Sequence, residues 1–408
     1  MAATTRPESS PEPATPEPAG RIGALTGRAV RDAAWLTADR ATAVAWLLFI
    51  ELLVLAITLP WTLPAFRPGY DFAIFWIAAR FALSGHAADA YGHAAQAAMT
   101  VMFGPGRHAP LFYPPTALLL WTPLALFPLG VAAGVWIGIT SAAYMAGIWV
   151  LAGRRAIAFA LGFPAVFTSV LLGQTALLTA GLFAGAAGSL DRAPWLAGML
   201  IGCLACKPQL AILAPLALAV AGRWQAFIAA ALTVMALLLG SVAAFGVASW
   251  EAFRAVLPMV NAWNGAADTR FDLFAGIYAG ARLLGAPEAA AWIVQIAAAI
   301  GSVVAVILVA RRRPGGRAEM AMLVVATGFC VPFLGDYDLV MFAIAGIWLG
   351  DEAARTGWLP YERAGLALLF VSPLAIKAAA STLGVPLAPA ALVILAVLVL
   401  RRIRRVRS

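Results

Sequence analysis

Long runs of apolar residues, separated by short polar breaks, make up most of the chain. A helix needs about 20 mainly apolar residues to cross the ~30 Å hydrocarbon layer of a membrane, and many runs approach that length. Strands of a membrane barrel would alternate apolar and polar side chains, whereas these runs are continuously apolar. The pattern predicts an all-α polytopic membrane protein.

Twelve apolar runs can be distinguished, which predicts a bundle of about 12 transmembrane helices. The runs cover residues 43–63, 111–129, 131–152, 156–173, 175–190, 194–222, 225–247, 288–310, 319–335, 337–350, 362–382 and 386–400. Several are shorter than an ordinary span, and short or broken helices are tolerated where protein or a water-filled cavity covers their ends. We therefore expect a cavity within the membrane domain.

The apolar runs also define the expected domains. Residues 1–40 begin with a Pro- and Glu-rich stretch and predict a disordered cytoplasmic segment. Residues 41–400 are expected to form the membrane domain. Residues 401–408 hold five arginines and predict a basic cytoplasmic tail.

Two long breaks, residues 64–110 and 248–287, are expected to be outer loops. The first carries all three histidines. Its part from Phe72 to Leu83 has helical spacing with aromatic residues on one side, which predicts a helix lying along the membrane surface.

Arginines set the expected orientation. Arg28, Arg31 and Arg40 precede the first run, so the N-terminus should be cytoplasmic, and an even number of spans returns the C-terminus to that side. Twelve plain spans would leave Arg154 and Arg155 outside. A re-entrant segment 111–129, together with a split of 194–222 at Lys207-Pro208, removes that conflict. Both topologies remain open, and both have the same outer loops.

Composition narrows the class further. Charged residues make up 12% of the chain against 63% hydrophobic residues, and most of the basic excess is arginine at the edges of apolar runs. This excess indicates topology rather than nucleic-acid binding, and no nucleic-acid partner is expected. The three cysteines lie in apolar runs without a second ligand pair, so we expect no metal site, no cofactor and no disulfide.

Asp71 follows the first apolar run, within Tyr70-Asp71-Phe72. Ionisable groups at membrane depth are costly and mark sites of chemistry or transport. Two roles fit Asp71: it caps the predicted surface helix, or it acts as a catalytic base, and one residue can do both. Arg80 follows nine residues later in the same helix.

Further polar residues interrupt apolar runs. Lys207 is one of two lysines in the chain, and a cation at this depth suits an anionic phosphate. Candidate substrate-binding residues near the breaks are Tyr113, Gln174, Gln209, Asp336, Asp338, Trp263 and Asn264. Tyr113 opens a helix start at Pro114-Pro115, and a plain helix entry is the alternative for that motif. Asp336 and Asp338 could equally form an ordinary hairpin loop.

Several short motifs together resemble glycosyltransferase family 87. They are Asp71-Phe72 with Trp76, Ala79-Arg80, Leu83, Gly85 and Tyr91, then Tyr113-Pro114-Pro115, then Gly173-Gln174, then Gly202 with Lys207-Pro208. The resemblance covers about residues 40–350 and extends to the mycobacterial phosphatidylinositol mannoside mannosyltransferases, to which the chain is similar. Where many relatives have a histidine-bearing motif, this chain has Gly335-Asp336-Tyr337-Asp338.

The resemblance implies a membrane enzyme of the GT-C type. Such enzymes transfer a sugar, a hexose such as mannose or a pentose, from a polyprenyl-phosphate donor to a glycolipid or glycan acceptor. An aspartate in the first outer loop acts as the general base, and Asp71 has that position. Lys207 and Arg80 are then expected to bind the donor phosphate.

The implied location is a bacterial inner membrane, with the active site on the outer face and membrane lipids around the protein. A transporter or a lipid flippase is the main alternative, in which Asp71, Lys207 and Asp336 would line a path. A transporter needs polar groups that are accessible from both sides of the midplane. The notable groups of this chain gather toward one face, which favours the enzyme.

Overall fold

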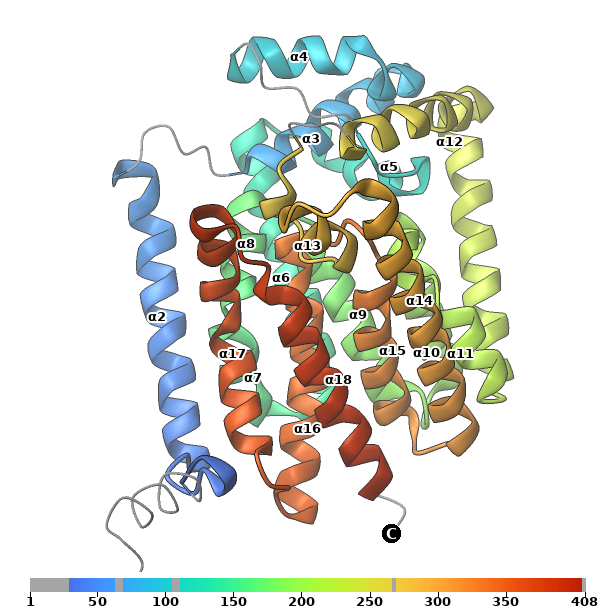
Figure 1. Cartoon of the computed structure of the whole chain (residues 1–408). Helices are drawn as coiled ribbons and strands as arrows, with labels where there is room; N and C mark the ends of the chain where they lie inside the picture. The colour runs from blue at the N-terminus through green and yellow to red at the C-terminus, as the bar shows by residue number, and fades with distance from the viewer. Residues whose placement is uncertain (1–28, 63–68, 105–110, 266–268, 406–408) are drawn as a thin grey trace, which may run out of the picture.

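The computed structural model describes residues 29–62, 69–104, 111–265 and 269–405. Nearly all secondary structure in this part of the chain is helical, and extended backbone pairs there only as a single antiparallel bridge between Phe274 and Gly335. Upright helices form a bundle, and further helices lie across one end of it (Figure 1). The predicted all-α fold class is confirmed.

The helices have the following bounds. In chain order they are α2 (Ala38–Thr62), α3 (Tyr70–Leu83), α4 (His93–Phe103), α5 (Pro115–Trp121), α6 (Leu129–Ala152), α7 (Ile157–Gly162), α8 (Pro164–Leu172), α9 (Ala176–Ser189), α10 (Pro194–Gly202), α11 (Ala214–Val220), α12 (Trp224–Gly265), α13 (Ile277–Leu283), α14 (Glu288–Arg312), α15 (Gly316–Cys330), α16 (Ala343–Thr356), α17 (Glu362–Ala378) and α18 (Leu387–Arg405). Short 3-10 turns lie between them, among them η1 (Ala87–Tyr91), η2 (Thr122–Leu126), η4 (Cys203–Cys206), η5 (Pro208–Ala211), η6 (Phe271–Leu273) and η7 (Asp336–Phe342). A π-helical turn, η8 (Ala379–Leu383), follows α17.

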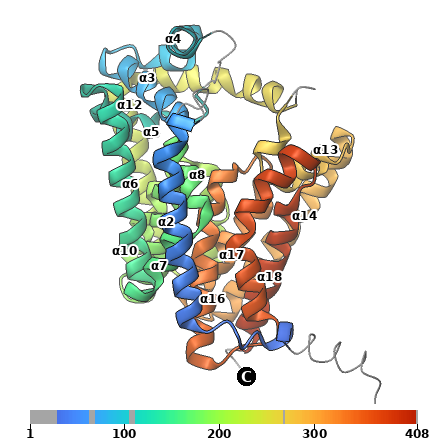
Figure 2. The same cartoon turned by 90° about the vertical axis from the view of Figure 1, so that its left-hand side faces the viewer.

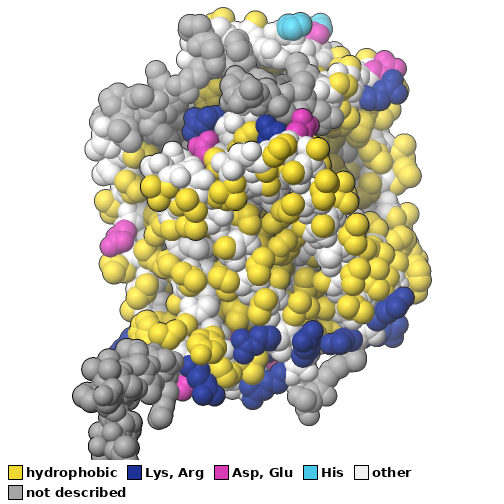
Figure 3. Space-filling view, viewed as in Figure 1, with side chains coloured by type: hydrophobic (Ala, Val, Ile, Leu, Met, Phe, Trp, Pro, Cys, Tyr) yellow, Lys and Arg dark blue, Asp and Glu magenta, His cyan; other side chains and the backbone are white. Residues whose placement is uncertain are grey.

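Five described helices, α2, α6, α12, α14 and α17, are long and apolar enough to cross a membrane. The pair α7–α8, bent by 66°, would make a sixth span. The predicted number of twelve is therefore not confirmed, because several apolar runs break into shorter helices. The outer surface of the bundle is a broad band of hydrophobic side chains, as a lipid-facing surface requires (Figure 3).

One end of the bundle holds a network of ion pairs. Arg317 donates a hydrogen bond to the carbonyl of Leu151 at the end of α6 and pairs with Asp351 of α16 at 2.8 Å. Arg223, before α12, pairs with Asp191 at 2.7 Å. These contacts bring the ends of five helices together. Lysine and arginine side chains gather along this lower edge in Figure 3.

The position of Arg154 and Arg155 favours one of the two predicted topologies. They follow α6 directly and so lie near Leu151, at the ion-paired end of the bundle. The predicted span 111–129 does not cross the bundle, because it is divided into α5 and η2. The Trp76 indole donates to the carbonyl of Phe127 and fastens the end of this segment to α3.

The run 194–222 is split at the predicted point and forms a hairpin. Its two arms are α10 and α11, with Lys207 between η4 and η5 at the tip. The ion pair between Asp191 and Arg223 closes the base of the hairpin. Gly198 of α10 packs directly on the backbone of Ala226 in α12, where any larger side chain would collide. The hairpin therefore enters the bundle and returns to the same end.

The two expected outer loops are largely helical. The first holds α3, η1 and α4, so the predicted helix from Phe72 to Leu83 is confirmed, and its location on a membrane surface stays a prediction. The second begins inside α12, which bends at Gly246 and continues to Gly265. Residues 248–265 of this expected loop are therefore helical, and their location on the outer side stays a prediction. Figure 2 shows these helices together above the bundle.

The basic tail is part of α18 as far as Arg405. Arg402 is fully buried there, forms an ion pair with Glu362 of α17 and donates to Thr356 and to the carbonyl of Gly357. Thus one residue of the expected tail fastens the ends of three helices. The expected disorder of residues 1–40 falls mainly on residues 1–28, outside the described part of the chain.

Candidate active site

Asp71 lies in the first turn of α3, and the backbone at its start is fixed by a neighbouring helix. The N–H of Gly69 donates to the carbonyl of Leu171, near the end of α8, at 2.7 Å. Gly69 is the N-cap residue and no side chain caps the helix, so the predicted capping role of Asp71 is wrong. Its carboxylate is instead directed at Gln174, in the turn between α8 and α9.

The Asp71 carboxylate accepts one hydrogen bond from a buried amide. Gln174 Nε2 donates to Asp71 Oδ2 at 2.6 Å, and the Gln174 side chain is almost fully buried. Within the described residues, Asp71 Oδ1 has no hydrogen-bond partner. One oxygen is thus held in place while the other can accept a proton.

Gly173 allows Gln174 to reach Asp71. Its φ of +70° lies in the left-handed region, and a Cβ there would be 2.6 Å from the Cβ of Phe72. The Trp136 indole donates to the carbonyl of Gly173 at 3.0 Å and fixes this turn. The Gly173-Gln174 motif therefore places the amide by close packing of the turn on α3.

Tyr113 connects the Asp71–Gln174 pair to the rest of the site. Its hydroxyl donates to Gln174 Oε1 at 3.2 Å and lies 2.9 Å from Thr175 Oγ1. The carbonyl of Tyr113 accepts a hydrogen bond from the Tyr91 hydroxyl. Pro114 occupies the N-cap position of α5, so the Tyr-Pro-Pro motif is both a helix entry and a support for Gln174.

Lys207, at the tip of the hairpin, forms a buried ion pair. Its Nζ lies 2.7 Å from both carboxylate oxygens of Asp338, with 5% of the lysine side chain and 3% of the aspartate side chain exposed. The ammonium also lies 4.9 Å from the ring centroid of Tyr337 and 5.8 Å from that of Tyr113. A buried charge needs such a partner, which explains the polar break at the hairpin tip.

A second ion pair was not predicted from the sequence. Lys377 Nζ, in α17, lies 2.9 Å from Asp336 Oδ2. The side chain of Lys377 is 43% exposed and that of Asp336 is 12% exposed. Lys377 is the only lysine of the chain besides Lys207, and this rarity is the sequence feature that could have marked it as a candidate.

Burial and the surrounding charges shift the pKa of the Asp71 carboxyl group. Burial raises the pKa of Asp71 above its ordinary value of 3.8, and the hydrogen bond from Gln174 opposes that rise. The negative charge of Asp336 raises the pKa further, whereas Lys207 and Lys377 lower it. A carboxylate with a raised pKa is a stronger base than an exposed one, and all four charged groups act on one site.

Other predicted residues lie elsewhere. Arg80 is exposed, with its guanidinium 5.6 Å from the ring centroid of Trp76. It lies about two and a half turns beyond Asp71, on the opposite face of α3. The side chain of Gln209 is exposed. Trp263 and Asn264 belong to the backbone of α12, but their side chains lie outside the described residues.

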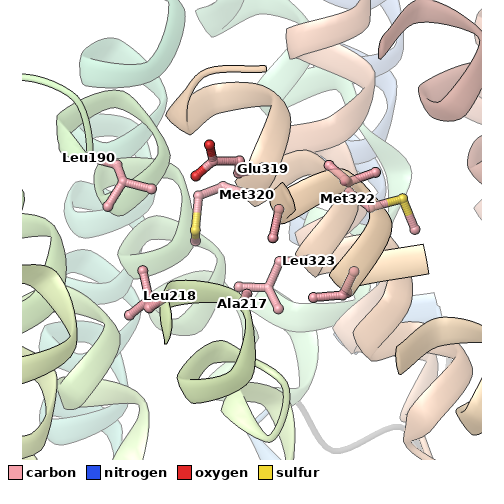
Figure 4. A pocket seen from close by; sticks show the side chains of 10 residues that line it. Leu190, Ala217, Leu218, Glu319, Met320, Met322 and Leu323 are labelled. Atoms are coloured by element: carbon pink, nitrogen blue, oxygen red, sulfur yellow. The ribbon is translucent and has the colours of Figure 1, made fainter. Parts of the chain in front are cut away.

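Two small cavities were found in the described part of the chain. One lies between α11, α14 and α15, and Glu319 is at its edge (Figure 4). The other lies between α3 and α4. Each has a volume of about 10 Å³, room for one water molecule at most. Asp71 lines neither of these two cavities.

Comparison with known proteins gives the site a context. Residues 111–334 match the model of glycosyltransferase family 87, and this range is more than half of the 408 residues. The chain belongs to glycosyltransferase family 87. No curated protein and no solved structure matches the chain.

Family 87 membership makes this protein a membrane glycosyltransferase that uses a sugar donor and an acceptor. The predicted resemblance is therefore confirmed at the level of the family. The matched range holds Tyr113, Gln174, Lys207 and the first part of the Val331–Asp338 turn. Asp71 and Lys377 lie outside it, so their roles depend on the geometry of this chain.

Proposed function

We propose that this protein transfers a sugar from a polyprenyl-phosphate donor to an acceptor hydroxyl, with inversion and with Asp71 as the general base. The geometry of the Asp71 carboxylate carries the proposal. Gln174 holds one of its oxygens, the other has no partner among the described residues, and two lysines act on it electrostatically. This arrangement suits a base beside an anionic leaving group.

The chemistry is a single displacement. The acceptor oxygen attacks the anomeric carbon and forms the new glycosidic bond while its proton passes to Asp71 Oδ1. The bond between the anomeric carbon and the phosphate oxygen breaks, and that oxygen keeps the electron pair. The leaving phosphate needs no general acid, but nearby cations stabilise its developing charge.

The proposal includes the side of the membrane that the active site faces. Arg31, Arg154 and Arg317 belong to the ion-paired end of the bundle, and the positive-inside rule assigns such an end to the cytoplasm. Asp71 lies in α3 at the opposite end (Figure 1). The proposed site therefore faces the outside or periplasm of a bacterial inner membrane. A lipid-linked donor suits this side, because the phosphate stays at the membrane boundary.

Sugar and acceptor are proposed as classes. The donor sugar is a hexose, with mannose the first to test, or a pentose, and the acceptor is a glycolipid or glycan. Tyr113 donates a hydrogen bond to Gln174, the charge of Asp336 acts on Asp71, and Asp338 pairs with Lys207. These three residues are proposed to contact the substrates. Arg80, on the far face of α3, is not retained for the donor phosphate.

The test supplies purified protein with radiolabelled polyprenyl-phosphate sugars and a lipid extract. Wild type should transfer at least one sugar, and Asp71→Asn should lower the rate by about 10²–10⁴-fold, the usual contribution of a general base. Asp89→Asn is the matched control, because Asp89 is an exposed aspartate of η1 at the same end. Transfer at the wild-type rate in Asp71→Asn would exclude the base role. Absence of transfer from every lipid-linked donor would refute the donor class.

A further inference from the structure

Lys377 lies near the end of the apolar helix α17, at the level of the active site. Glu362, at the other end of α17, belongs to the ion-paired end of the bundle through Arg402. Lys377 follows Glu362 by 15 positions, or about 22 Å of helix, so Lys377 lies near the opposite membrane boundary. A lysine at this depth can extend to the interface at little cost. Here it is turned to Asp336 instead.

The two lysines of the site differ in what they can bind. Lys207 is buried and held by both oxygens of Asp338, so a ligand that took Lys207 would leave Asp338 as an unpaired buried charge. Lys377 is 43% exposed and contacts one oxygen of Asp336. An ion pair whose cation is partly exposed and makes a single contact contributes less stability than a fully buried pair and exchanges partners more readily. Lys377 is therefore the cation that a ligand can reach.

The backbone around Lys377 is irregular. Pro373 interrupts α17 one turn before it, and the π-helical turn η8 begins two residues after it. The hydroxyl of Ser381 donates to the carbonyl of Lys377 within this wide turn. π-Turns occur frequently at functional sites, and this one directly follows the end of the helix that carries Lys377.

Several carboxylates lie around Lys377. The charge of Lys377 acts on Asp71 and on Asp272, and its direct partner is Asp336. Asp272 already has a partner, since it forms two 2.7 Å hydrogen bonds with Arg270. Asp71 has Gln174. Asp336 is thus the anion that pairs with Lys377 in this structure.

We infer that Lys377 binds the phosphate of the lipid-linked donor, and that Asp336 and this phosphate compete for the same position on the lysine ammonium. The inference rests on the proposed function. When the donor binds, a phosphate oxygen replaces Asp336 Oδ2 on the lysine ammonium. Lys377 then stays beside the phosphate as the glycosidic bond forms and stabilises the leaving group.

The exchange predicts opposite effects from the two members of one ion pair. The probe is a short-chain polyprenyl phosphate without sugar, titrated into purified protein in nanodiscs, with the matching polyprenol as the uncharged control. Lys377→Gln should weaken binding of the phosphate by about tenfold or more, because a hydrogen bond between charged groups is lost. Lys377→Arg should stay within about threefold of wild type. Asp336→Asn should bind the phosphate several-fold more tightly than wild type, because the competing anion is gone.

A purely structural ion pair would behave differently. Both Lys377→Gln and Asp336→Asn would then weaken binding together with a lower thermal midpoint, and polyprenol binding would fall in parallel. That result would overturn the inference, as would wild-type affinity in Lys377→Gln or the absence of phosphate-dependent binding by wild type. Inorganic phosphate and phosphatidic acid are also tested as competitors of the polyprenyl phosphate. Their effect shows whether the site distinguishes the donor from other phosphate compounds. Equal competition by phosphatidic acid would overturn the assignment to the donor.

The binding assay is independent of sugar transfer. If Lys377-dependent binding is found but no donor supports transfer, the proposed function fails while the phosphate site stands. If wild type transfers sugar and Lys377→Gln has an unchanged donor KM, the inference fails while the function stands.

Discussion

Asp71 Oδ2 and Gln174 Nε2 lie 2.6 Å apart, although the two residues are separated by 103 positions in the sequence. Three features hold this hydrogen bond: the docking of Gly69 on the end of α8, the left-handed turn at Gly173, and the bond from Tyr113 to the other end of the amide. The pair is built by long-range packing. The effect of this pairing can be measured as a change in the pKa of the Asp71 carboxyl group.

Gln174→Ala should move the acid limb of the pH profile of kcat/KM to higher pH. The base must be ionised to accept a proton, and the bond from Gln174 favours the ionised form and so lowers the pKa of Asp71. Without that bond the pKa rises above its already raised value. A shift of up to about one pH unit corresponds to ~1.4 kcal/mol, which is typical of one such hydrogen bond.

Thr175→Val is the matched control for Gln174→Ala. It removes the other hydrogen-bond partner of the Tyr113 hydroxyl and does not touch Asp71. Its acid limb should coincide with that of wild type. An unchanged limb in Gln174→Ala, or an equal shift in both variants, would contradict the assignment of Asp71 as the titrating base.

Most residues of the site could be predicted from the sequence, because a polar group inside an apolar run is costly and needs a reason. This reasoning predicts Asp71, Gln174, Tyr113 and Lys207 as candidate site residues. Their pairing could not be predicted, since it depends on a hairpin tip and a left-handed turn that bring distant segments together. Lys377 was missed because a lysine near a helix end is ordinarily explained by snorkelling.

The fold was predicted at the level of its class. Apolar runs give helices, but run length does not distinguish a crossing helix from one arm of a hairpin such as α10. The loop expected from residue 248 is a helix, since the bend at Gly246 turns α12 without ending it. Arg80 shared a helix with Asp71 in the prediction, but helical phase puts it on the opposite face.

Lys207→Met should destabilise the fold strongly. The variant leaves Asp338 buried without a partner, and breaking one half of a buried pair costs about 3–5 kcal/mol. The thermal midpoint in detergent should therefore fall by several degrees. The double variant Lys207→Met/Asp338→Asn should recover most of the loss, because no unpaired charge remains. A double variant as unstable as the single one would show that the ion pair is not the cause.

Gly173→Ala should impair transfer more than its strain alone explains. An alanine in the left-handed region costs about 1–2 kcal/mol at any position. At Gly173 its Cβ would also collide with Phe72 and move Gln174 away from Asp71. Gly384→Ala is the control, since Gly384 lies in the same left-handed region (φ +66°) but has open space around it. We expect both variants to lose some thermal stability and only Gly173→Ala to lose activity by more than about tenfold. Equal activity in the two variants would contradict the positioning role of this turn.

Glu51→Leu should stabilise the protein without affecting transfer. Glu51 lies near the middle of α2, is exposed on the apolar surface, and has no ion-pair or hydrogen-bond partner among the described residues. A charged side chain at the centre of a membrane helix costs about 2.5–3.5 kcal/mol on insertion scales, and leucine is favourable there. Insertion of α2 in a reporter assay should therefore improve, and the thermal midpoint should rise. Glu251→Leu is the comparison, because Glu251 is equally exposed but lies beyond the bend of α12 at Gly246. It should bring no gain, since that part of α12 lies across the end of the bundle (Figure 2). A loss of stability in Glu51→Leu would mean that this carboxylate is used by a neighbour on the lipid-facing side of α2.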